Sequence, residues 1–152
     1  MQQPKKRVIG FFFLLICFFS CMKTNDEAER IKKEVREEVK SGSWKIAKHI
    51  YIGEDKTSEW AGFNFRFKNS DVLEVVKDSV TYNGWWKVFV VERAYSGIAI
   101  DNVSFNMGFN EDHSIDSLSY AWGIISYSSG KLELMDVLSD TNLVDYLTFE
   151  KN

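Results

Sequence analysis

The sequence predicts an all-β fold, an eight-stranded antiparallel up-and-down barrel preceded by one amphipathic helix. Short runs of β-branched and aromatic residues, alternating with polar ones, recur from residue 43 to the end of the chain. Turn-forming residues separate these runs, and the one proline lies at position 4, so no predicted strand contains proline. Short connections favour strands that pair in chain order, and barrel closure leaves no exposed edge. A two-sheet sandwich is the alternative architecture.

Residues 1–20 have the organisation of a lipoprotein signal peptide. Lys5, Lys6 and Arg7 precede an uncharged run over residues 8–19. These 12 residues are fewer than the roughly 20 that a membrane-spanning helix needs. Ser20 and then Cys21 follow directly. We therefore expect cleavage before Cys21 and lipidation of its thiol; the alternative is an uncleaved signal anchor with an ordinary cysteine.

Processing at Cys21 changes the properties of the mature chain. Cys17 would leave with the signal, so no disulfide could form. Without the three basic residues of the signal, 16 basic residues remain against 22 acidic ones, a net charge of −6. An acidic chain repels phosphate backbones, so nucleic acid is not an expected partner. The expected location is the outer membrane, on its periplasmic face or on the cell surface, through the lipid anchor at Cys21.

Residues 21–41 predict a lipidated cysteine, a short polar tether and a helix over 26–40. Apolar residues recur at helical spacing and form one narrow face: Ala28, Ile31, Val35 and Val39. Ser41-Gly42 predicts the end of the helix. The acidic pair Asp26-Glu27 has two interpretations, a surface-export signal close to the lipidated cysteine or the favourable first turn of a helix.

Residues 42–152 predict the barrel. The expected strands span 43–51, 62–68, 72–77, 85–92, 98–108, 118–127, 131–137 and 143–150. Residues 63–68 alternate aromatic and polar side chains, which predicts one buried and one solvated face. Three polar clusters predict tight turns, at 69–71, 82–84 and 128–130. The polar segment 54–60 is longer than a hairpin turn and predicts a short helix over one end of the sheet.

Several segments resemble the lipocalin-like lipoproteins of Bacteroidota, especially of Flavobacteriia. They are Gly42-Ser-Trp-Lys-Ile, Gly62-Phe-Asn-Phe-Arg-Phe, Asn83-Gly-Trp-Trp-Lys-Val, Lys131-Leu-Glu-Leu-Met-Asp and Asp145-Tyr-Leu-Thr-Phe-Glu-Lys. The segment before Cys21 also resembles the loose lipobox of that group. The resemblance covers residues 42–152. It implies an eight-stranded barrel that binds a small apolar molecule, and it assigns no role to the loops around 92–97 and 109–117.

No catalytic, metal or cofactor site is expected. The two histidines, His49 and His113, are not part of a zinc-ligand pattern, and no nucleophile elbow or phosphate loop occurs. Loop oxygens at Asp101-Asn102, Asp112 and Asp116 suggest calcium, but they do not form the ligand series that calcium needs. We therefore expect these residues to be solvated surface and the chain not to be an enzyme.

Aromatic residues on inward faces are the candidate ligand site. The predicted ligand-binding residues are Trp44, Phe65, Trp86, Phe105, Tyr120 and Trp122. Barrels of this size either fill their interior with side chains or hold one small ligand, so a filled core and a real cavity both remain open. A cavity would suit a small hydrophobic ligand. A filled barrel would instead be a scaffold for an envelope protein, which would contact the helix or exposed Trp60, Trp85 or Tyr127.

Overall fold

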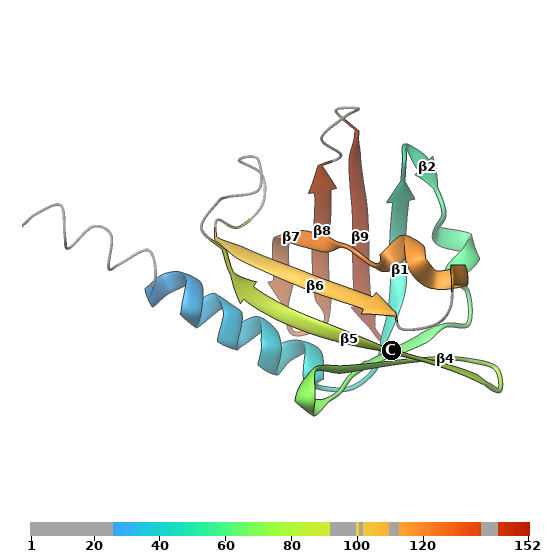
Figure 1. The fold of residues 1–152 in the computed structure, drawn as a ribbon, viewed down its shortest axis with the longest axis horizontal. Helices are drawn as coiled ribbons and strands as arrows, with labels where there is room; N and C mark the ends of the chain where they lie inside the picture. Colours follow the sequence, from blue (N-terminus) through green and yellow to red (C-terminus); the bar gives the residue numbers. More distant parts are fainter. Residues whose placement is uncertain (1–25, 92–99, 101, 110–112, 138–142) are drawn as a thin grey trace, which may run out of the picture.

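The structure is a computed structural model that describes residues 26–91, 100, 102–109, 113–137 and 143–152. An α-helix over residues 26–40 precedes the sheet (Figure 1). The strands are β1 (Trp44–Tyr51), β2 (Glu54–Asp55), β3 (Asn64–Phe67), β4 (Val72–Lys77), β5 (Val80–Val90), β6 (Val103–Phe109), β7 (Ala121–Ser128), β8 (Lys131–Val137) and β9 (Val144–Lys151). Connections carry the 3-10 helices η1 (Thr57–Trp60), η2 (Asn69–Asp71) and η3 (His113–Leu118).

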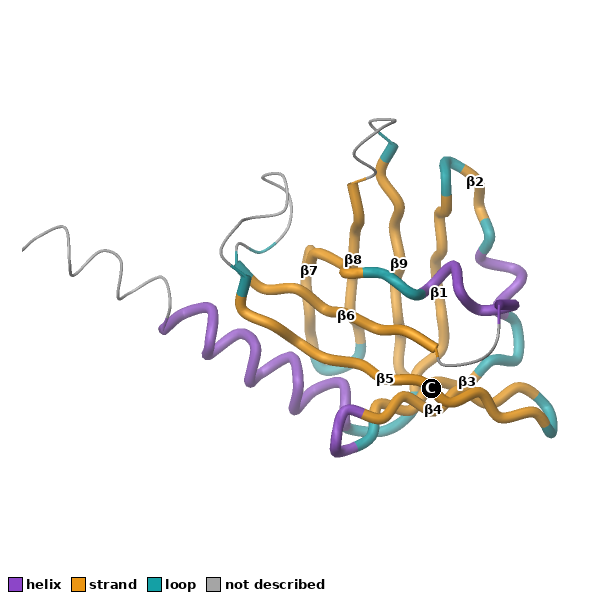
Figure 2. The backbone as a smooth tube through the Cα atoms, viewed as in Figure 1, coloured by secondary structure: helices purple, strands orange, loops and turns teal. Residues whose placement is uncertain are grey.

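Eight strands close into an antiparallel up-and-down barrel, which confirms the predicted fold class. The strands pair in the order β1-β3-β4-β5-β6-β7-β8-β9, and β9 pairs back onto β1 (Figure 2). Strand β2 adds a two-residue hairpin arm to the end of β1, as Tyr51 pairs with Glu54. Because the strands form one continuous sheet, the architecture is a barrel and not a sandwich.

The N-terminal helix packs its predicted apolar face on the barrel. All four residues of that face are buried: Ala28, Ile31, Val35 and Val39. Arg36 directly follows Val35 on the helix. Its guanidinium lies 4.9 Å from the centroid of the Trp86 ring and donates a hydrogen bond to Asp71 of η2 at 2.9 Å. Lys151 at the end of β9 forms an ion pair with Glu38. The helix therefore covers the barrel end formed by η2, the β7–β8 turn and the end of β9.

The helix end is the end of the barrel that the helix covers, and the far end is the one where β1 stops at Tyr51 and β9 begins at Val144. Successive inward side chains on a strand lie two residues apart, about 7 Å along the barrel. The interior can therefore be described in layers from the helix end to the far end.

The turn predicted at residues 82–84 is wrong. Asn83 and Gly84 lie inside β5 and pair with Glu74 and Leu73 of β4. The chain reverses instead after Lys77, where Asp78 adopts a positive φ of 53°. Gly84 is required by close strand packing, because a Cβ there would lie 2.3 Å from the carbonyl oxygen of Gly108 on β6. Glycine marks a close approach at this position.

The other local predictions agree with the structure or differ at boundaries. The turns at 69–71 and 128–130 connect β3 to β4 and β7 to β8. The segment 54–60 contains η1, as expected. The strand predicted from residue 118 begins at Ala121, because η3 continues to Leu118.

Several predictions fall outside the described residues. They include the signal peptide, the lipidation of Cys21 and the tether, all within residues 1–25, and the loop residues Asp101 and Asp112. Among the residues that the structure describes, no helix is long and apolar enough to cross a membrane.

Candidate functional site

Aromatic rings in mutual contact fill the barrel interior near the helix end. Phe67 lies at the centre, with ring centroids 5.5 to 5.6 Å from those of Phe105, Phe149 and Trp86 in edge-on contacts. Phe65 adds another edge-on contact with Phe149 at 5.2 Å. All five side chains are essentially inaccessible to solvent. We call these five residues the aromatic floor.

The indole N–H groups around the floor have partners within the protein. Trp44 donates to the Val39 carbonyl at the end of the helix at 2.8 Å, and Trp86 donates to the Lys68 carbonyl at 3.1 Å. Cations cover both of these rings, since Lys151 lies 5.1 Å above Trp44 and Arg36 lies above Trp86. Hydrogen-bonded indoles and packed rings are typical of a finished core.

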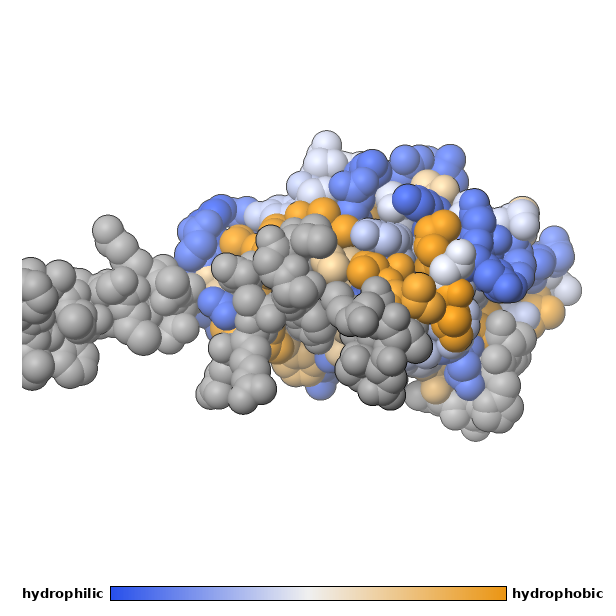
Figure 3. Space-filling model, turned by 90° about the horizontal axis from the view of Figure 1, so that it is seen from above, coloured by the Kyte–Doolittle hydropathy of each residue, from blue (hydrophilic) through white to orange (hydrophobic). Residues whose placement is uncertain are grey.

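Polar side chains replace the rings inside the far end. Tyr51 of β1 and Tyr120, which precedes β7, share a hydrogen bond between their hydroxyl oxygens at 3.1 Å. This hydrogen bond, followed by burial, raises the pKa of Tyr120 to about 12. Viewed from above, hydrophobic residues gather in the middle of the visible surface, and hydrophilic residues lie along its upper and right-hand parts (Figure 3).

Two aspartates are direct cross-strand neighbours near the far end. Asp136 of β8 pairs in register with Asp145 of β9, and both continue the inward faces that Leu134 and Leu147 begin. Asp145 is only 1% exposed, and its Oδ1 accepts a hydrogen bond from the Ile52 N–H at 2.7 Å. Burial raises the pKa of Asp145, and the Ile52 hydrogen bond partly opposes this rise.

His49 lies one layer deeper and is fully buried. Its Nδ1 accepts a hydrogen bond from the Trp60 indole N–H at 2.8 Å, so a neutral ring carries its proton on Nε2. Among the residues that the structure describes, that Nε2 has no hydrogen-bond partner. Burial lowers the pKa of His49 to about 4, which keeps the ring neutral at physiological pH. We call His49, Tyr51, Tyr120, Asp136 and Asp145 the far-end cluster.

A β-bulge explains why sequence patterns missed His49. The register between β1 and β9 shifts between Ile46 and Lys48, which changes the phase of the inward face. Strict alternation from Trp44 would place Lys48 inside and His49 outside. The sequence contains one indication of this shift. Strict alternation would place Lys48 inside the barrel, and a lysine at an inward position indicates that the alternation has shifted.

The predicted ligand-binding residues separate into two groups. Phe65, Trp86 and Phe105 belong to the aromatic floor, and Trp44 lies beneath the end of the helix. Tyr120 and Trp122 lie together on the η3 side, with centroids 5.9 Å apart, and the Trp122 N–H donates to the Leu118 carbonyl. Of the six, Tyr120 is the one that belongs to the far-end cluster.

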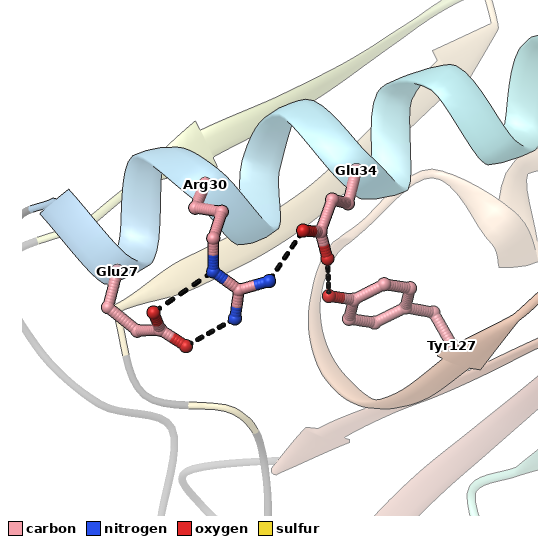
Figure 4. Close-up of polar contacts among 4 residues, drawn as sticks. All are labelled: Glu27, Arg30, Glu34 and Tyr127. Atoms are coloured by element: carbon pink, nitrogen blue, oxygen red, sulfur yellow. Dashed lines mark hydrogen bonds and ion pairs between the residues drawn. The ribbon is translucent and has the colours of Figure 1, made fainter.

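A groove of about 600 Å³ lies between the N-terminal helix and the β7–β8 turn. Glu34 and Tyr127 meet in it, with the hydroxyl donating to the carboxylate at 2.6 Å (Figure 4). Arg30 joins Glu34 to Glu27 along the helix surface. The Tyr127 hydrogen bond is the largest cause of a lowered pKa at Glu34. Since these charges compensate one another, the groove has no strong preference for a charged ligand.

The outer face of β4 and β5 carries exposed apolar side chains. Val72 pairs directly with Trp85, and the two side chains are 39% and 42% exposed; Phe89 further along β5 is 40% exposed. Trp60, expected to be exposed, is instead 5% exposed, because it packs against His49, Phe63 and Phe65. Among the described residues, no group of three or more His, Cys, Asp or Glu side chains is placed to hold a metal ion.

Comparisons with known proteins give one structural likeness. No family model matches the chain, and no curated protein matches it. The chain is similar to the crystal structure of a DUF4847 family protein from Bacteroides vulgatus, with 18% sequence identity and a TM-score of 0.46. The likeness covers 78% of this chain and 97% of the other.

Proposed function

We propose that the chain is a membrane-anchored lipoprotein, lipidated at Cys21, whose barrel binds a small, largely apolar molecule without catalysing a reaction. Its resemblance to the lipocalin-like lipoproteins and its signal-like N-terminus motivate the anchored part of this proposal. The proposed site is the far end of the barrel, with Tyr51, Tyr120 and Trp122 as its walls. The floor residues form its base.

The Nε2–H of His49, which has no partner among the described residues, carries this proposal, because one hydrogen-bond acceptor on an otherwise apolar guest would satisfy it. A buried donor without an acceptor costs about 1 to 3 kcal/mol, so native proteins rarely retain one without a reason. In the described part of the floor, by contrast, rings pack closely and the indole groups are hydrogen-bonded. The contrast supports a filled base and a guest-binding upper interior.

Native and denaturing mass spectrometry would test binding directly. The protein would be purified as residues 22–152 from a lipid-containing host, so that lipidation does not add mass. A reproducible extra mass that is lost on unfolding would support a carried ligand. Equal masses, together with no uptake of added apolar probes, would contradict the binding function. Labelling with radioactive palmitate, and its loss in Cys21→Ala, would test the anchor separately.

A second function, docking of an envelope protein, is favoured by the exposed apolar side chains Val72, Trp85 and Phe89 on the outer face of β4 and β5. Exposed apolar surface of this kind marks interaction sites when it is extensive. A photo-crosslinking residue at position 89 would capture a defined partner in cells under this alternative. The same residue at position 45, on the outer face of β1, is the matched control. Equal labelling at both positions would count against docking.

A further inference from the structure

The barrel wall has a short ladder between β1 and β3. These two strands share one paired position, Trp44 with Phe65, near the helix end. Beyond Trp44, the chain that leads into β3 lies beside β1 in place of a strand (Figure 1). It begins with β2, which pairs with Ile50 and Tyr51, and continues into η1. We call residues 54–60 the strap, and the part of the wall that they close the β1–β3 seam.

His49 holds the strap through three hydrogen bonds. Its carbonyl oxygen accepts from the Lys56 N–H at 2.8 Å, and its own N–H donates to the Thr57 hydroxyl oxygen at 2.9 Å. Its Nδ1 accepts from the Trp60 indole N–H at 2.8 Å. The Trp60 ring is 5% exposed and contacts both His49 of β1 and Phe65 of β3, so it fills the seam between the two strands.

Protonation of His49 removes the acceptor that holds Trp60. A protonated imidazole carries an N–H on each ring nitrogen and offers no acceptor. Its Nδ1–H would face the indole N–H, and a half-turn of the ring would present a C–H there, so neither orientation restores the hydrogen bond. The charged ring would also be fully buried, which is costly. Outward movement of Trp60 relieves both penalties, because it frees the indole N–H and lets water reach the ring.

Burial is the main reason that the closed seam keeps His49 neutral. Burial lowers its pKa, two acids of the strap oppose this change and one lysine adds to it: Glu59, Asp55 and Lys56. From β9, the closest titratable position in sequence is Asp145, two residues before Leu147, which pairs with His49. From β1, the Tyr51 ring lies 5.9 Å away. Exposure of the His49 ring would raise its pKa towards 6.5, so opening of the seam takes up a proton.

The strap lies between two glycines with positive φ. Gly53 precedes it with a φ of 75°, and Gly62 follows Trp60 with a φ of 83°. A Cβ at either position would meet no atom within 4 Å, so close packing does not fix these glycines. Glycine adopts many backbone conformations at little cost, so both positions suit the backbone rotation that outward movement of the strap needs.

We propose that the β1–β3 seam is an acid-sensitive gate, closed while Trp60 donates to neutral His49 and opened when His49 is protonated and the strap moves outwards about Gly53 and Gly62. Opening uncovers Phe65 of the aromatic floor and so provides a lateral route to the barrel interior. The gate depends on the strap alone and does not rest on the proposed binding function.

Hydrogen exchange measured by mass spectrometry on the full chain tests the gate. After correction for the intrinsic pH dependence of exchange, protection of the strap should fall at least tenfold from pH 7 to pH 5. The strap should exchange faster than β8 at both pH values. Low concentrations of urea should accelerate exchange in β8 but not in the strap, because a local opening exposes little surface. Equal exchange and equal urea dependence in both segments would overturn the gate, as would strap protection that is the same at both pH values.

The two histidines of the chain provide matched variants. His49→Asn keeps an oxygen acceptor for Trp60 and does not titrate, so strap protection should be the same at pH 5 and pH 7. His113→Asn should retain the wild-type loss. The opposite pattern, or an unchanged loss in His49→Asn, would overturn the assignment. If His49→Asn fails to fold, Trp60→Phe, which lacks the indole N–H, must reduce strap protection at pH 7 by about fivefold, the effect of one ordinary hydrogen bond; equal protection in Trp60→Phe and wild type would overturn it.

Discussion

The two ends of the barrel differ in how completely their buried polar groups are hydrogen-bonded or paired. At the helix end, aromatic rings interlock, the indoles of Trp44 and Trp86 donate to backbone carbonyls, and Arg36 and Lys151 cover their outer faces. At the far end, His49 has an N–H without a partner among the described residues, and the causes that shift the pKa of the buried Asp145 include no described cation. Packing and hydrogen bonding are therefore more complete at the helix end than at the far end, where buried polar groups remain that a finished core would exclude.

Replacing Trp86 with alanine should produce the largest loss of stability. The ring is fully buried and contacts Phe67, Phe105 and Arg36, so we expect the free energy of unfolding to fall by about 3 to 5 kcal/mol. Urea denaturation followed by circular dichroism would measure the change. Trp85→Ala is the matched control, since its ring is 42% exposed on the opposite face of the same strand. Equal losses in both variants would contradict the assignment of the floor.

Acidification should destabilise the far end through His49. Its folded pKa of about 4 lies below the unfolded value of about 6.5, so the unfolded chain binds more protons between these two pH values. Stability is therefore fully present above pH 6.5 and falls as the pH drops towards 4, by about 3 kcal/mol from this group. Denaturation of wild type and His49→Asn at several pH values should show a flatter pH profile in the variant.

Asp145 provides a control, because its effect on the pH dependence of stability has the opposite sign to that of His49. Its pKa is raised in the folded state, so its contribution favours folding at low pH and is lost as the pH rises through the folded value. Asp145→Asn should therefore make the loss of stability on acidification steeper than in wild type. If both variants shift the pH profile in the same direction, the opposed burial of these two groups is wrong.

Replacing Arg36 should weaken the packing of the N-terminal helix on the barrel, with a smaller loss of stability than the changes above. Arg36→Ala removes the hydrogen bond to Asp71 and the contact with the Trp86 ring, both of which are part-buried, so we expect a loss of about 1 to 2 kcal/mol. Hydrogen exchange should increase in residues 26–40 before it increases in the strands. Arg30→Ala, on the exposed face of the same helix, should leave both measurements nearly unchanged. A helix that exchanges equally fast in both variants would show that Arg36 does not hold it.

The sequence predicted the floor better than the far-end cluster, for a physical reason. Inward residues such as Phe65 and Trp86 follow period-two alternation, which β3 and β5 display along their own length. His49 depends on a bulge that shifts β1, and the pairing of Asp136 with Asp145 depends on the register between two strands. Gly84 was assigned to a turn because glycine suits both turns and close strand contacts. Apart from Lys48, which strict alternation would place inside the barrel, these properties set by strand pairing have no local signal.

The smallest expected effect on stability comes from removing one hydroxyl of the Tyr51–Tyr120 pair at the far end, and the Tyr127 hydroxyl in the groove at the helix end provides its control. Tyr51→Phe removes the hydrogen bond that most raises the pKa of Tyr120, so this pKa should fall from about 12 towards the ordinary value of 10. The free energy of unfolding should change by only about 1 kcal/mol, the typical net contribution of one hydrogen bond. Tyrosine-selective NMR titration would follow Tyr120. Tyr127→Phe removes the hydroxyl that donates to Glu34 and should leave the pKa of Tyr120 unchanged. If the pKa of Tyr120 stays near 12 in Tyr51→Phe, burial and the charges of Asp136 and Asp145, and not the hydroxyl pair, raise that pKa.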